Sequence, residues 1–163
     1  MDRYGISVQI KNVPALDPEF TPMLKYNQAF LATAKKPVAI AVERADGQMS
    51  THHTFIHGTP EMKEADCYYI DRLVKTELWM KGGYKVYVND SEIYEYLKGV
   101  YCAGGEREFD WDFMSDVFEK PFEVVLTNEI PETLDKPVSM AAIWTVAASV
   151  SMQAVPTARS PLW

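Results

Sequence analysis

Two hydrophobic periodicities alternate along the chain and predict its secondary structure. Residues 5–10 have the composition of a β-strand. Residues 17–34 carry apolar positions at helical spacing, and Pro22 obscures the start of that helix. The chain is therefore expected to open with a strand and a helix.

A hairpin is predicted next. Residues 37–44 and 48–57 are two strand-like runs, and Asp46 and Gly47 lie between them. An Asp-Gly pair between apolar runs is a strong short-range signal for a β-hairpin.

Capping residues divide the following segment into helices. Thr59, with Pro60 behind it, matches an N-cap, and a helix is expected from there to about residue 80, ended by Gly82 and Gly83. A strand is expected at 84–88. A helix should follow from Asp90 or Ser91 to about residue 102, and Gly104 and Gly105 should end it. The last two elements are expected to be a helix at 110–119 and a strand at 121–126. This order predicts an α/β fold, with helices packed on a mixed sheet that contains the hairpin.

Composition narrows the function classes. The net charge of −7 and pI near 5.0 argue against nucleic-acid or anionic-membrane binding, which need a basic surface. Cys67 and Cys102 are far apart and lack a CxxC spacing, so buried free thiols are expected. No secretory signal pattern opens the chain and no stretch reaches the roughly 20 apolar residues of a membrane span, so a cytoplasmic location is expected.

The character of the sequence changes near its end. A polar, proline-containing connector at 128–137 precedes an Ala-, Ser- and Thr-rich tail whose last 23 residues, 141–163, contain Arg159 as their only charged residue. This composition fits neither an amphipathic helix nor a solvated tail, and an irregular tail at 139–163 is expected.

A shift of reading frame near Met140 accounts for this composition. Codons read from the third base of Met140 permit a glycine-rich string, DAGGS, in which the alanine is forced by the Met152 and Gln153 codons and the other letters are allowed. That string resembles the first phosphate-binding segment of sugar kinases in the actin and hexokinase superfamily. In such a loop, small residues let backbone amides approach a nucleotide phosphate. The translated chain itself contains no such loop.

Residues 4–138 carry a second resemblance. The segments YGISVQIKNVPALDPEF, KPVAIAVER, TFIHGTPEM, LVKTELWMKGGYKVYV and REFDWDFMSDVFEKPFEVV resemble the amino-terminal extension of certain bacterial ROK (repressor, open reading frame, kinase) family proteins. The resemblance implies an α/β accessory domain at 1–138 of a longer parent protein, whose kinase core would use ATP and Mg²⁺ to phosphorylate a sugar. It implies no cofactor and no catalysis in this chain, with the missing kinase core as partner.

His57, Gly58 and Thr59 are the candidate substrate-binding residues. They precede a predicted helix, where free backbone amides and the helix dipole favour a phosphate or a sugar. Helix capping is the simpler interpretation of Thr59. His53 and His57 on one strand face could instead join an acidic residue at a metal, although no recognisable ligand spacing is present.

Two further groups of residues are candidates for function. Glu106, Glu108, Asp110 and Asp112 could serve acid-base chemistry or bind a cation, but a solvated loop with Asp110 as helix cap explains them more simply. The aromatic residues are numerous, and any surplus over core packing predicts a contact surface for the kinase core or for self-association. They are Tyr68, Tyr69, Trp79, Tyr84, Tyr87, Tyr94, Tyr96 and Tyr101.

Three functions follow from these observations. The first is an inactive accessory fragment of a sugar-kinase-like protein. The second is a stand-alone binding module that uses an aromatic face. The third is a small enzyme that uses His57 and the acidic loop.

Overall fold

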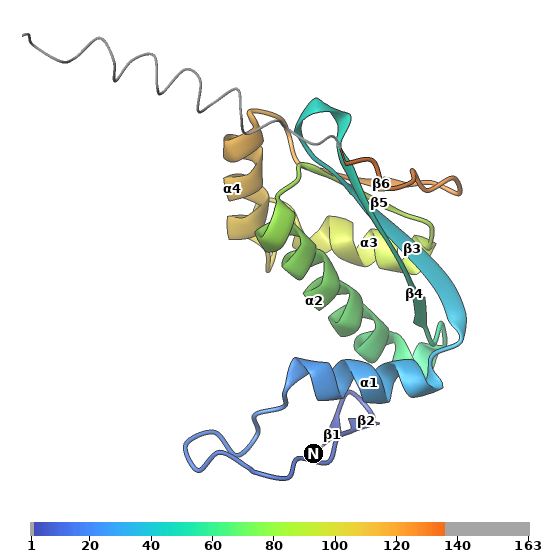
Figure 1. Cartoon of the computed structure of the whole chain (residues 1–163), viewed down its shortest axis with the longest axis vertical. Helices are drawn as coiled ribbons and strands as arrows, with labels where there is room; N and C mark the ends of the chain where they lie inside the picture. The colour runs from blue at the N-terminus through green and yellow to red at the C-terminus, as the bar shows by residue number, and fades with distance from the viewer. Residues whose placement is uncertain (1, 136–163) are drawn as a thin grey trace, which may run out of the picture.

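The computed structural model describes residues 2–135, and the predicted tail at 139–163 and the apparent frame shift at Met140 lie outside them. A four-stranded sheet in the order β4-β3-β5-β6 is covered on one face by helices (Figure 1). The elements of the sheet layer are β3 (Lys36–Glu43), β4 (Met49–Ile56), β5 (Lys85–Val88) and β6 (Glu123–Leu126). The helices are α1 (Met23–Thr33), α2 (Lys63–Lys81), α3 (Ser91–Val100) and α4 (Glu108–Phe118).

The predicted hairpin is confirmed. β3 and β4 pair antiparallel from Lys36 opposite Ile56 to Glu43 opposite Met49. The connection is a short 3-10 turn in which Asp46 and Gly47 both have positive φ, 59° and 68°, as their residue types allow. The Asp-Gly pair therefore marks the turn correctly.

The sheet is mixed, as expected for the α/β class. β5 pairs antiparallel with β3 and parallel with β6. Because parallel neighbours need a long crossover, the segment between β5 and β6 is where α3 and α4 lie. The core between the sheet and the helices α2 and α3 contains buried apolar residues: Val38, Ile40, Val42, Val86, Val88, Ile70, Val74, Leu78, Ile93 and Leu97.

Asp90, one of the two N-cap residues that the sequence offers, is the N-cap of α3. Its carboxylate accepts hydrogen bonds from the backbone amides of Glu92 and Ile93 at 3.0 and 3.1 Å. The same carboxylate forms an ion pair with the Lys36 ammonium at 2.6 Å. Burial raises the pKa of Asp90, but the Lys36 ammonium and these amides outweigh burial and lower it below its usual range. The same contact raises the pKa of Lys36.

Several predicted boundaries were wrong. The first strand is only β2 (Ile6–Ser7), paired with β1 (Asp2–Arg3) apart from the main sheet. α1 starts at Met23, because Pro22 cannot lie inside a helix. α3 ends at Val100, so Gly104 and Gly105 lie in the turn beyond it and do not form its C-cap. Gly82 does cap α2, with φ of 76°.

The start of α2 also differs from the prediction. Thr59 has the extended backbone of an N-cap, but its side chain makes no capping hydrogen bond. A 3-10 turn, Pro60–Met62, intervenes before α2 begins at Lys63. Within residues 2–135, none of the helices is long and apolar enough to cross a bilayer.

Candidate functional site

Two of the backbone amides predicted to bind an anion, those of His57 and Gly58, are already bonded within the protein. Asp66, in the first turns of α2, reaches back so that its carboxylate accepts hydrogen bonds from the backbone amides of His57 at 2.9 Å and Gly58 at 2.7 Å. The same carboxylate lies 2.9 Å from the His57 ring atom Nδ1. An internal carboxylate thus occupies the position that the sequence suggested for a phosphate.

The rest of the His57 ring is engaged as well. Its Nε2 lies 2.9 Å from Thr33 Oγ1, and the Phe30 ring packs edge-on at 4.7 Å between centroids. The His57 side chain is 10% exposed. Substrate binding by His57, Gly58 and Thr59 stays a prediction, and these contacts give His57 and Gly58 a structural role that binds the β4–α2 turn to α1 and α2.

The other histidines lie apart from this turn. His52 and His53 are both exposed on β4, whereas His57 lies beyond the end of that strand. In the described part of the chain, no three His, Cys, Asp or Glu residues are grouped closely enough to hold a metal ion.

The predicted acidic loop does not converge on one point. Glu108 accepts a hydrogen bond from the Gly104 amide at 3.0 Å, while Glu106 and Asp112 are exposed. Asp110 was expected to cap the helix, but it lies inside α4 and is 2% exposed. Sequence reasoning misjudged it because α4 starts at Glu108, two residues earlier than expected.

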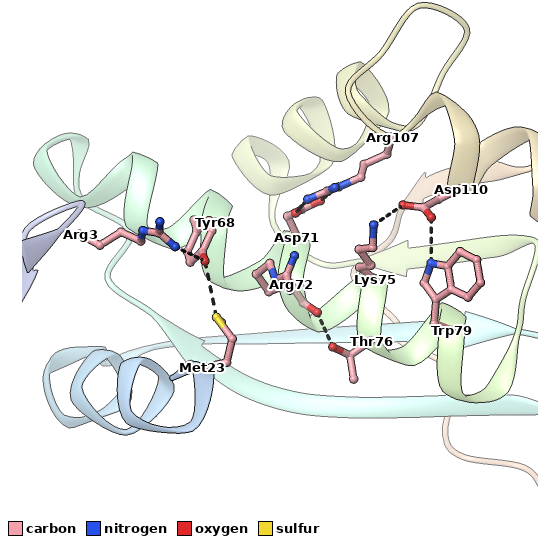
Figure 2. A network of polar contacts seen from close by, with 10 residues as sticks. All are labelled: Arg3, Met23, Tyr68, Asp71, Arg72, Lys75, Thr76, Trp79, Arg107 and Asp110. Carbon is pink, nitrogen blue, oxygen red and sulfur yellow. Dashed lines mark hydrogen bonds and ion pairs between the residues drawn. The ribbon is translucent and has the colours of Figure 1, made fainter. Parts of the chain in front are cut away.

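Asp110 instead fastens α4 to α2. Its carboxylate accepts a hydrogen bond from the Trp79 indole at 2.8 Å and pairs with Lys75 at 3.2 Å (Figure 2). The α2 residues of this contact, Lys75 and Trp79, lie 9 and 13 positions beyond Asp66, roughly 14 and 20 Å along the helix. His57 and the acidic loop therefore do not form one catalytic constellation.

A pocket of about 590 Å³ opens between α2 and the turn after α3. Its wall includes Cys67, Tyr68, Tyr96 and a paired Asp71 and Arg107. The Arg107 guanidinium donates two hydrogen bonds to the Asp71 carboxylate (Figure 2), and this bonding raises the pKa of Arg107. Burial raises the pKa of the Cys67 thiol to about 11, so it is a poor nucleophile. Asp71 and Arg107 of this pocket therefore satisfy each other's charge.

An exposed apolar surface lies where α4 meets the end of α2. We call Trp79, Phe109, Phe113 and Val117 the aromatic ridge. Its three rings are nearly parallel: Trp79 stacks on Phe113 at 5.5 Å and 8°, and Phe109 stacks on Phe113 at 5.9 Å and 13°. Phe109 is 68% exposed and Trp79 is 49% exposed. A cluster of solvent-exposed aromatic side chains is typical of a protein interaction surface.

Only one residue of the ridge was among the aromatic residues singled out from the sequence. Of those, Tyr69, Tyr84 and Tyr101 are buried and the other tyrosines are half-buried, so Trp79 alone is exposed. Phe109, Phe113 and Val117 recur every four residues, and this spacing beside buried Asp110 and Met114 could have revealed the ridge.

Comparisons with known proteins identify no relative from which a function could be inferred. No family model matches the chain, and searches of curated proteins and of solved structures found no significant match.

Proposed function

We propose that residues 2–135 form a non-catalytic docking domain that binds another protein through the aromatic ridge. The observation that supports this most directly is the parallel stacking of Trp79, Phe109 and Phe113 in an exposed position. Aromatic side chains bury much area at little cost in side-chain entropy, and they are enriched at protein interfaces.

The resemblance to the ROK family suggests what the domain docks to. We propose that it is the amino-terminal accessory domain of a cytoplasmic sugar-kinase-like parent, that ATP and Mg²⁺ belong to the kinase core, and that the ridge covers part of that core. A stand-alone binding module is the second candidate, and the same ridge supports it.

Sequencing the coding DNA beyond Met140 tests whether the chain derives from a longer kinase-like parent protein. We expect the alternative frame to stay open for the length of a kinase core and to encode an aspartate that can act as the catalytic base. An early stop codon in that frame would refute the proposal of a kinase parent. Titration of this chain with ATP and Mg²⁺ should give no binding heat.

Docking is tested separately with the product of that downstream frame, expressed on its own. Size-exclusion chromatography and calorimetry should detect a complex with this chain, and Phe109→Ser should weaken it. The matched control is Phe55→Ser, because Phe55 on β4 is 49% exposed and lies outside the ridge. Equal loss with both variants, or none with either, would count against the ridge.

A further inference from the structure

The exposed surface of α4 consists of two parallel stripes. The aromatic ridge contributes Phe109, Phe113 and Val117, and an acidic stripe of Glu108, Asp112 and Asp116 runs beside it. Both sets recur every four residues, and each acidic residue directly precedes an apolar one. At 100° per residue the two stripes therefore lie side by side along the helix.

The acidic stripe is not neutralised within the described residues. None of its three carboxylates forms an ion pair there, and α4 itself carries no basic residue. Nearby cations are engaged elsewhere: Lys75 pairs with Asp110, and Arg107 pairs with Asp71. A partner that covers the ridge must therefore meet three adjacent negative charges on one border.

The opposite border of the ridge is held in place. The Trp79 indole stacks on Phe113 and donates its hydrogen bond to buried Asp110, so the ring is fixed before any partner arrives. A preformed surface loses little conformational entropy on binding.

Charge complementarity selects the occupant. A second copy packed antiparallel on the same face would bring acidic stripe toward acidic stripe, and an anionic membrane would be repelled. Side chains spaced every four residues form the ridges that pack into grooves of another helix. We propose that the aromatic ridge binds an amphipathic helix of a partner protein whose apolar face is bordered by Lys or Arg, and this inference rests on the proposed docking function.

The probe is a synthetic amphipathic peptide of roughly 20 residues, with leucine on one face and lysine along its border, about 30 Å long when helical. A companion peptide carries glutamate in place of each border lysine. Both carry a fluorophore and are titrated with the full chain by fluorescence anisotropy. The lysine peptide should bind roughly tenfold more tightly at low salt, the size expected from three exposed ion pairs, and added salt should reduce the difference.

Charge reversal separates this inference from docking itself. Asp112→Lys with Asp116→Lys should favour the glutamate peptide, whereas Glu19→Lys with Glu95→Lys, an equal change of charge elsewhere, should leave the preference intact. Far-UV circular dichroism of both double variants must match that of the parent chain. Equal affinity for both peptides, a preference for glutamate by the unmodified chain, or binding unaffected by Phe109→Ser would overturn the inference.

Other results assign the ridge to a different occupant. Failure of both peptides while the kinase core still binds overturns the basic helix but leaves docking standing. Failure of both peptides and of the core removes the docking function as well. A dimer in light scattering that Phe109→Ser dissociates would assign the ridge to a second copy, and co-sedimentation with phosphatidylserine vesicles would assign it to a membrane. Either result overturns the inference.

Discussion

Replacing Asp66 by alanine tests the structural role given to the turn of His57 and Gly58. The substitution removes the acceptor for two backbone amides and for the His57 ring. An unsatisfied buried donor costs about 1–3 kcal/mol, and bonds to a charged acceptor lie in the upper part of that range. Because Gly58 is exposed and water can reach its amide, we expect a total loss of roughly 2–4 kcal/mol.

Asp66→Asn is the graded companion to this variant. It keeps one oxygen for His57 but turns an amide group toward the Gly58 N–H, so about half of the loss is expected. Asp112→Ala, on the exposed face of α4, is the control and should stay within about 0.5 kcal/mol of the parent chain. Urea unfolding followed by far-UV circular dichroism gives all three values from the midpoint at constant slope.

Asp66→Ala also tests the anion site predicted from the sequence. With the Asp66 carboxylate removed, inorganic phosphate should restore part of the stability of Asp66→Ala and leave that of the parent chain unchanged. A loss below about 0.5 kcal/mol for Asp66→Ala would refute the role assigned to the carboxylate.

Three further predictions concern other parts of the fold. Because the pKa of Asp90 is depressed in the folded state, its contribution to stability is present above about pH 4 and is lost as the pH falls further; the urea midpoint should therefore fall more steeply in acid for the parent chain than for Asp90→Asn. Cys102 is half-buried and should react first with a thiol reagent, whereas Cys67, which is buried and has a raised thiol pKa, should react much more slowly; equal rates for the two thiols in the native protein would contradict this assignment. Gly83→Ala should lose roughly 1–3 kcal/mol, because φ is 154° and an added Cβ would lie 2.2 Å from a β3 side chain, whereas Gly99→Ala in α3 meets nothing within 4 Å and should be neutral or stabilising.

Local signals could be predicted well from the sequence. Asp46 and Gly47 specify their turn through their own backbone preferences, and Asp90 caps α3 with amides two and three residues away. Such contacts join neighbours in the chain, so the residue types alone reveal them.

Contacts between distant segments could not be predicted in this way. Asp66 and Asp110 were placed in or near helices, but the partners of their buried carboxylates come from a preceding turn and from another helix. The ridge was missed for the same reason, since α4 starts earlier than its capping pattern suggested and the neighbouring Trp79 comes from α2.

The isolated bridge between Met49 and Leu134 protects an otherwise open edge of the sheet. β4 is an outer strand, and the segment around Leu134 pairs with its first residues through two backbone hydrogen bonds, while Thr51 bonds to Thr133 and Pro131. Unpaired strand edges recruit strands from other molecules and promote aggregation. Residues 131–135 therefore contribute to solubility, and a shortened chain that lacks them would expose that edge and tend to aggregate.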